Sequence, residues 1–203
     1  MIFLKRIFDL TLTIFGTILI SPLLVFIAYK IHKEDPGPII FSHTRIGKDG
    51  KEFSCHKFRT MVINSDEVLE KYLLQNPVAK AEWESNFKLK DDPRITPIGE
   101  FLRKSSLDEL PQIFNVLKGD MSLVGPRPVV REELDRYYCE ATKDYYSVRP
   151  GITGLWQVSG RNDVSYDKRV AMDVEYIRTH NLWMDIVLLY KTIDVVWNKK
   201  GAY

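Results

Sequence analysis

The most apolar stretch of the chain is residues 10–29, in which no charged residue occurs and Leu, Ile, Phe and Val dominate. About 20 apolar residues are enough to cross a bilayer as an α-helix. Ser21 and Pro22 lie near the centre of this stretch, and a proline inside a helix removes a backbone hydrogen bond and bends the axis. The pattern therefore predicts a membrane helix with a break or bend at Ser21-Pro22.

Basic residues flank both ends of the apolar stretch, which bears on how it meets a membrane. Lys5 and Arg6 precede it, and Lys30, His32 and Lys33 follow it. Because basic residues favour the cytoplasmic side, a re-entrant helix that enters and leaves through one leaflet fits the pattern. Proline kinks are also ordinary in helices that span the bilayer, so both arrangements remain open. No small-residue cleavage site follows the stretch, which argues against a cleavable signal peptide.

Alternating polar and apolar residues after the membrane segment predict a β-hairpin. Its candidate strands, 39–45 and 51–59, are separated by the turn residues Gly47-Lys48-Asp49-Gly50. Near the end of the second strand, Lys57 and Arg59 are two residues apart and are therefore expected on one face. These cations either bind an anionic ligand or guard an exposed edge strand.

Helical periodicity predicts several amphipathic helices in the rest of the chain. Two charged helices between Ser65 and Lys90 have the character of an insertion or a mobile cover. The last predicted helix, 182–197, contains too many charges to span a bilayer, so it packs as core or lies on the membrane surface. The predicted helices are 65–75, 79–90, 98–104, 110–117, 129–142, 166–179 and 182–197, with caps at Asn64 or Ser65, Thr96 and Ser165.

Together these elements predict an α+β fold with a membrane helix at 1–33 and a cytosolic domain at 34–203 that lies on the membrane. A chain of 203 residues is long enough for one domain with a core and an appendage. The formal net charge of +2 gives no basis for a nucleic-acid-binding surface. Cys55 and Cys139 form no metal-binding or disulfide pattern, which fits a reducing, cytosol-facing location.

The richest chemistry lies between Lys104 and Pro128, where Asp108 and Glu109 precede an amphipathic helix. A helix N-terminus favours ionised carboxylates and attracts phosphate, so a nucleophilic carboxylate and a phosphate can meet there. The alternative is purely structural, with Asp108 as an ordinary N-cap. A capping box formed by Ser106 and Glu109 is less favourable, because Pro111 would then leave a helical carbonyl unpaired.

Cations and a glycine-rich loop supply candidate anion-binding groups. Arg103 ends the short helix before the carboxylate pair, and Arg127 stands between two prolines that restrict its backbone. The loop 145–163 carries glycines, aromatic residues and hydrogen-bonding side chains, which fits either nucleotide binding or a β-rich loop with an aromatic core. The candidate substrate-binding residues are Lys57, Arg59, Arg94, Arg103, Arg127, Arg149, Gln157, Arg161 and Asn162.

Four motifs together strongly resemble the bacterial sugar transferase family, the small monotopic phosphoglycosyl transferases that begin assembly of cell-surface glycans. They are KFRTM at 57–61, DPRITPIGEFLRKSSLDELPQ at 92–112, NVLKGDMSLVGPRP at 115–128 and RPGITGLWQVSGRN at 149–162, and the similarity begins at KRIFDL, 5–10. The resemblance implies that the chain is a minimal form of the family, without the extra N-terminal membrane helices that larger members carry. It also implies a re-entrant helix at Ser21-Pro22 on the cytoplasmic face of the bacterial inner membrane.

The same resemblance implies a catalytic dyad of Asp108 and Glu109, with Asp108 as nucleophile and magnesium ligand and with Arg103 and Arg127 near the substrate phosphate. The implied enzyme transfers hexose-1-phosphate from a UDP-hexose to a polyprenyl phosphate, with undecaprenyl phosphate as the expected acceptor, and releases UMP by a ping-pong route. The ending WNKKGAY, 197–203, is similar to members that act on galactose or glucose. Inner-membrane lipid and a second copy of the chain are further expected partners, and nucleic acid is not.

Two alternatives remain beside this reading. One is a membrane-anchored scaffold that binds a nucleotide sugar without turnover and uses Asp108 only as a helix cap. The other is a single-spanning transferase whose soluble part lies outside the cell.

Overall fold

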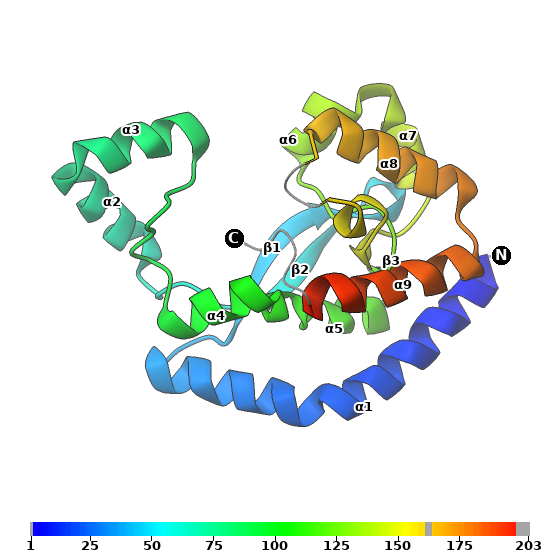
Figure 1. Cartoon of the computed structure of the whole chain (residues 1–203), viewed down its shortest axis with the longest axis horizontal. Coiled ribbons are helices and arrows are strands. Elements are labelled where there is room, and N and C mark those ends of the chain that lie inside the picture. The colour runs from blue at the N-terminus through cyan, green and yellow to red at the C-terminus, as the bar shows by residue number, and fades with distance from the viewer. Residues whose placement is uncertain (1, 161–163, 198–203) are drawn as a thin grey trace.

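The computed structural model describes residues 2–160 and 164–197 and has the α+β architecture predicted from the sequence (Figure 1). A long N-terminal helix runs along one side of a domain that contains two small sheets and shorter helices. The α-helices are α1 Ile2–Glu34, α2 Ser65–Gln75, α3 Pro77–Asn86, α4 Pro97–Ser105, α5 Gln112–Lys118, α6 Arg131–Glu133, α7 Thr142–Tyr146, α8 Tyr166–Thr179 and α9 Leu182–Trp197. The strands are β1 Ile40–Ile46, β2 Glu52–Phe58, β3 Ser122–Val124 and β4 Gly151–Thr153.

Helix α1 stays helical through Pro22, so the predicted break is only a bend in a continuous helix. Pro22 has no N–H to donate to the carbonyl of Ile18, four residues earlier. The hydroxyl of Ser21 donates to that carbonyl at 2.9 Å instead. Ser21 thus satisfies the group that Pro22 leaves unpaired, as Ser and Thr side chains do in membrane helices, and α1 follows a smooth arc in Figure 1.

Both ends of α1 are attached to the same domain. Near the start, the Lys5 ammonium lies 2.7 Å from Asp185 of α9, and Arg6 donates to the carbonyl of Val116 at 2.7 Å. Near the other end, Ile27 and Ile31 are buried in a cluster with Phe58 and Leu102. The two ends are therefore held by contacts with one body.

The middle of α1 instead exposes large apolar side chains. Ile18 and Leu19 are 67% and 81% exposed, and Phe15 is 69% exposed. By length and composition, Phe3–Glu34 is long and apolar enough to cross a membrane. Water would hydrate this apolar surface at a large cost in free energy, which a lipid environment removes.

The hairpin of β1 and β2 forms as predicted, with Ile40 opposite Phe58 and Ile46 opposite Glu52. A short parallel pair, β3 and β4, was not foreseen from the sequence. Asn115 of α5 is fully buried and joins this helix to the hairpin. Its side chain accepts from the backbone N–H of His56 at 3.0 Å and donates to the carbonyl of Ser54 at 2.7 Å.

Helices α2 and α3 form an arm that projects away from the rest of the domain in Figure 1. Helix α2 has the predicted bounds, and α3 ends at Asn86 instead of Lys90. An isolated β-bridge between Met61 and Ile95 brings the two ends of the arm together. Whether this arm is an insertion or a mobile cover stays a prediction.

The segment predicted as one helix over 129–142 is irregular. After α6, a π-helical turn spans Leu134–Tyr138, and a 3₁₀ turn spans Cys139–Ala141 before α7 begins. Cys139 has a positive φ of 44°, which the α-helix cannot contain. Leu134 and Tyr138 are nevertheless buried beside Tyr145, so the segment contributes to the core.

Candidate active site

The carboxylate pair lies in a short turn between α4 and α5 and not at the start of a helix. Helix α4 begins at Pro97 with the Thr96 hydroxyl accepting from Gly99 N–H at 3.0 Å, and it ends before Ser106, which adopts a left-handed conformation with φ of 57°. Leu107–Glu109 then form one 3₁₀ turn.

The predicted capping roles of this turn are wrong. Ser106 makes no side-chain capping hydrogen bond, so the capping box with Glu109 does not form. Helix α5 begins only at Gln112, where Pro111 is the N-cap residue and no side chain caps the helix. Asp108 is therefore not an N-cap, which removes the structural explanation for its presence.

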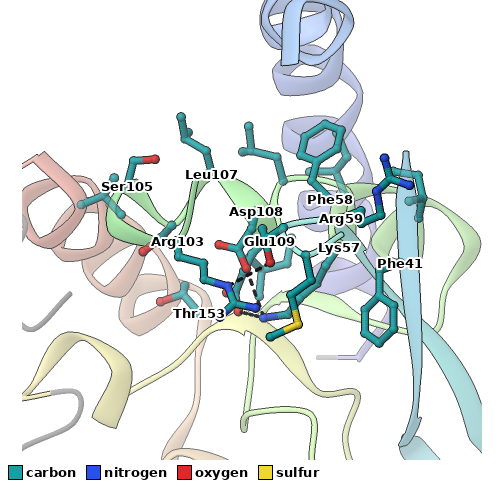
Figure 2. Close-up of a pocket in the computed structure, with 18 of the residues that line it drawn as sticks. Phe41, Lys57, Phe58, Arg59, Arg103, Ser105, Leu107, Asp108, Glu109 and Thr153 are labelled. Atoms are coloured by element: carbon teal, nitrogen blue, oxygen red, sulfur yellow. Dashed lines mark hydrogen bonds and ion pairs between the residues drawn. The ribbon is translucent and has the colours of Figure 1, made fainter. Parts of the chain in front are cut away.

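Lys57 of β2 reaches across to both carboxylates (Figure 2). Its ammonium lies 2.6 Å from Oε1 of Glu109 and 3.5 Å from Oδ2 of Asp108. Burial would lower the pKa of Lys57, but the charges of Glu109 and Asp108 outweigh it and raise that pKa. Lys57 is thus a permanent positive charge at neutral pH.

Asp108 is the more enclosed member of the pair, with a side chain that is 13% exposed, against 35% for Glu109. Burial raises the pKa of Asp108, the charge of Lys57 opposes that effect, and the charge of Glu109 adds to it. A carboxylate poorly solvated by water and held beside cations is suited to attack a phosphorus atom.

The turn opens into a cavity of about 900 Å³ that also contains other predicted site residues. Arg103, Arg127 and Gln157 line it together with Lys57 and the carboxylates. Figure 2 shows Arg103 directed toward Asp108, and its Nε donates to the Thr60 hydroxyl at 2.9 Å. Arg127 is also held by Glu133, with 3.4 Å between Nη1 and Oε2. The cavity brings these cations and the carboxylates to one place.

Apolar side chains form much of the remaining wall. Phe41, Phe58, Leu107, Ile113 and Trp156 are among the residues that line it. A cavity with clustered charges and an apolar wall matches a ligand that carries both an anionic group and a hydrocarbon part.

Three predicted binding residues take other positions. Arg59 lines the cavity, but its guanidinium points away from the carboxylates in Figure 2 and pairs with Asp35 at 3.7 Å. Arg94 does not line the cavity, because it pairs with Asp92 at 2.7 Å and lies over the ring of Trp83.

Arg149 is also absent from the cavity wall, and its Nε donates to the carbonyl of Gly119 at 2.7 Å. Arg161 and Asn162 lie outside the described residues. Lys57 and Arg59, which were expected on one face, both line the cavity, but Lys57 pairs with Glu109 and Asp108 whereas Arg59 pairs with Asp35.

Two residues that were not predicted from the sequence, Thr60 and Asn115, hold parts of the site in place. Thr60 is buried and orients Arg103, and Asn115 fastens α5 to β2. A polar residue on an otherwise apolar face is the available signal for both, because buried polar groups need hydrogen-bond partners. Thr60 follows Phe58 by two residues, and Asn115 lies between Ile113 and Val116.

The described residues contain no group of three or more acidic, histidine or cysteine side chains that could hold a metal ion. Asp108 and Glu109 offer two carboxylates in one cavity. Mg²⁺ is commonly held by one or two carboxylates together with substrate phosphates and water, so the residues present fit a magnesium ion that arrives with a diphosphate.

The fold and the site define a protein with one long apolar helix and a cavity in which acidic and basic groups lie beside apolar side chains. The chain belongs to the bacterial sugar transferase family, whose model matches residues 1–199. This result agrees with the resemblance seen in the four sequence motifs.

Several named relatives extend this result. The chain is 57% identical over 201 residues to the undecaprenyl-phosphate galactose phosphotransferase of Salmonella typhimurium, covering 99% of this chain and 42% of the relative. It is 49% identical over 199 residues to the exopolysaccharide production protein ExoY of Sinorhizobium fredii, covering 98% and 88%. It is 40% identical over 207 residues to the UDP-glucose:undecaprenyl-phosphate glucose-1-phosphate transferase of Escherichia coli, covering 98% and 41%. The chain thus spans less than half the length of the Salmonella and Escherichia relatives.

Proposed function

We propose that the protein is a phosphoglycosyl transferase that moves hexose-1-phosphate from a UDP-hexose to a polyprenyl phosphate, with undecaprenyl phosphate as acceptor, and releases UMP. The observation that carries this proposal is that Asp108 caps no helix and instead faces a cavity shared with Glu109, Lys57, Arg103 and Arg127. The names of the relatives support the class of donor and acceptor and favour galactose or glucose as the sugar.

In the first step an oxygen of Asp108 attacks the phosphorus that bears the sugar. The bond from this phosphorus to the UMP oxygen breaks, so UMP leaves and the hexose phosphate remains on Asp108 as an acyl phosphate. In the second step an oxygen of the lipid phosphate attacks the same phosphorus, and the Asp108 carboxylate is released. Glu109 takes the proton of the incoming lipid phosphate when that phosphate arrives protonated.

The cations of the site would stabilise the charge of the diphosphate. Phosphoryl transfer depends mostly on positioning and on electrostatic stabilisation of the oxygens. Arg103 and Arg127 are positioned to bind these oxygens, since both line the cavity. Asp108 is the protein ligand proposed for Mg²⁺, which when bound neutralises diphosphate charge and assists departure of UMP.

The membrane helix gives this reaction its location. We propose that α1 is re-entrant and inserts its exposed central residues, including Ile18 and Leu19, into the cytoplasmic leaflet of the inner membrane. Attachment of both helix ends to one domain supports this arrangement, because the domain cannot lie on both sides of a bilayer. The cavity would then lie within reach of a lipid phosphate and a soluble nucleotide sugar.

The test is to mix detergent-purified protein, Mg²⁺ and UDP-galactose or UDP-glucose without lipid phosphate, and to follow UMP and the protein mass. We expect a stoichiometric burst of UMP and a hexose phosphate adduct on Asp108. If UMP forms only after polyprenyl phosphate is added and no adduct is trapped, direct transfer in a ternary complex replaces the covalent route.

Asp108→Asn separates the enzyme from the non-catalytic scaffold. Loss of the nucleophile should lower turnover by on the order of 10³-fold or more, while the unfolding temperature changes little because Asp108 caps no helix. Glu100→Gln is the matched control, since Glu100 is exposed on α4 and does not line the cavity. Full retention of a saturable UDP-hexose site without UMP release by the unmodified protein would favour the scaffold.

A further inference from the structure

A second, smaller cleft lies at the beginning of α1, away from the carboxylate pair. Its volume is about 40 Å³, and it is bounded by the start of α1, the hairpin turn at Lys48 and the end of α8. The cavity at the carboxylate pair measures about 900 Å³, so this cleft is far smaller and suits a small polar group better than a nucleotide sugar. Its basic lining residues are Lys5, Arg6, Lys48, Arg149 and His180.

Arg6 and Arg149 meet at the C-terminal end of α5. Arg6 donates to the carbonyls of Val116 and Leu117 at 2.7 and 3.1 Å, and Arg149 donates to the carbonyl of Gly119 at 2.7 Å. The negative end of the α5 dipole lies at these carbonyls. They accept hydrogen bonds from one side of each guanidinium.

Carboxylates neutralise the positive charge of this pair only in part, because the charge of Asp9 acts on Arg6 without forming a salt bridge with it. Within the part of the chain that the structure describes, neither Arg6 nor Arg149 forms a salt bridge, and the two guanidinium charges repel each other. The dipole of a short helix compensates at most part of two full charges. An anion placed between them would relieve the repulsion.

The acidic group in the cleft is already engaged. Asp9 accepts from the Ser122 hydroxyl at 2.7 Å and lies 3.8 Å from the ammonium of Lys5. Lys5 in turn pairs with Asp185 at 2.7 Å. Lys48 makes no side-chain hydrogen bond or ion pair with any described residue, so the cleft retains an excess of positive charge.

Exposed apolar side chains a few residues along the chain from the cleft point to a lipid as the source of the anion. Phe3 and Leu4 are 76% and 59% exposed just before the basic residues of α1, and Trp183 of α9 is 73% exposed three residues after His180. Tryptophan and basic side chains together are typical of the membrane interface. If α1 enters a bilayer, these exposed side chains would meet its surface within three residues of Arg6 and His180, which line the cleft.

We propose that this cleft binds the phosphate of an anionic membrane lipid and so fixes the N-terminal end of α1 at the membrane surface. The lipid phosphate would contact the guanidinium groups of Arg6 and Arg149 and the ammonium of Lys48, while its acyl chains lie against Phe3 and Trp183. This role is separate from the proposed transfer reaction and does not depend on it.

The experiment is native mass spectrometry of the full-length protein in mild detergent, titrated with phosphatidylglycerol, phosphatidylcholine, inorganic phosphate or UDP. We expect one retained phosphatidylglycerol and binding of phosphatidylcholine that is at least tenfold weaker. Lys48→Gln should weaken phosphatidylglycerol binding about fivefold, the typical contribution of one basic residue at an anionic surface. Lys51→Gln is the matched control, because Lys51 is exposed on the same turn outside the cleft, and it should bind as the unmodified protein does.

Arg149→Gln tests the guanidinium pair, with Arg149→Lys as the variant that retains charge. Since Arg149 also binds the carbonyl of Gly119, circular dichroism must show that each variant is folded, and Lys48→Gln serves if Arg149→Gln is not. Equal binding of the two lipids, or Lys48→Gln binding as Lys51→Gln does, would overturn the proposal. Saturable phosphate or UDP binding that Lys48→Gln weakens, without selective lipid binding, would assign the cleft to a soluble anion and reject the lipid.

Discussion

The ammonium of Lys5, near the start of α1, lies 2.7 Å from the fully buried carboxylate of Asp185, near the start of α9. At the other end of α1, the carboxylate of Glu34 accepts from the backbone N–H of Ile98 in α4 at 3.2 Å. Removal of either partner from the Lys5–Asp185 pair would leave an uncompensated buried charge or a displaced helix end, which is costly. The apolar helix is thus tied to the domain at two separate points.

The first prediction concerns the sidedness of these two points. In a Cys139→Ser background, which removes the exposed cysteine, a cysteine is placed either directly after Met1 or at the exposed position 33 by Lys33→Cys. An impermeant maleimide should label neither site in intact cells and both sites after lysis, because the proposed re-entrant helix has both ends in the cytoplasm. Labelling of one site in intact cells would instead establish a spanning helix.

The second prediction concerns the charge of Lys57 beside the carboxylate pair. Lys57 lowers the pKa of Asp108, against the effect of burial that raises it. In Lys57→Gln the acidic limb of the kcat/KM profile should therefore move to higher pH, so that the loss of UMP formation is larger at pH 6 than at pH 8. Lys104→Gln, which removes an exposed cation on α4, should leave the shape of the profile unchanged. A uniform loss at all pH values would show that Lys57 acts only in binding.

The third prediction concerns Asp173, which is fully buried on α8 and accepts from the Tyr138 hydroxyl at 2.7 Å. Burial raises the pKa of Asp173 to about 7. The native state therefore binds more protons than the unfolded state between about pH 4 and pH 7, and the free energy of unfolding falls as pH rises through that range. The full effect is on the order of 4 kcal/mol.

Asp173→Asn keeps an acceptor for Tyr138 but cannot ionise. Relative to this variant, the unmodified protein should lose stability from pH 5 to pH 8, as measured by urea unfolding in detergent. Identical pH dependence of the two proteins would show that Asp173 is not the group responsible.

The fourth prediction compares two residues that the sequence presents as equal helix caps. The Thr96 hydroxyl accepts from Gly99 N–H at 3.0 Å, whereas Ser165 makes no side-chain capping hydrogen bond before α8. Thr96→Val should lower the free energy of unfolding by about 1 kcal/mol, and Ser165→Ala should change it by less than about 0.5 kcal/mol. Equal losses in the two variants would contradict this difference.

Elements with strong local patterns were predictable from the sequence. The hairpin follows from alternation on both sides of Gly47–Gly50, and the bounds of α2 and α9 match the predicted ranges. These segments need little information about distant neighbours. The parallel pair of β3 and β4 was not foreseen, because each strand has three residues and pairs with one far along the chain.

The carboxylate turn shows why the candidate site was only partly predictable. The sequence identified Asp108 and Glu109, but the left-handed conformation of Ser106 separates α4 from α5 and moves the pair out of any cap position. The left-handed φ of 57° at Ser106 therefore determines where the pair lies. The helical periodicity of the sequence gives no sign of this conformation.

The arginines predicted for the site differ in which protein groups bind their guanidinium groups, and the sequence does not show which group each one binds. Arg94 is taken by Asp92 two residues away, and Arg149 by a carbonyl thirty residues away. Arg103 and Arg127 retain positions on the cavity wall. The residue type was informative in each case, but tertiary contacts determined which guanidinium groups reach the site.

The bridge between Met61 and Ile95 has a consequence for how this protein can be altered. The two ends of the arm are fastened at that bridge. A longer chain between α2 and α3 should therefore leave the contact between Thr60 and Arg103 in place. The entropic cost of closing a longer loop grows slowly with its length. The turn at Asn76, between α2 and α3, is therefore the place where an affinity tag or a fluorescent domain can be inserted while the geometry around Arg103 and Asp108 is preserved.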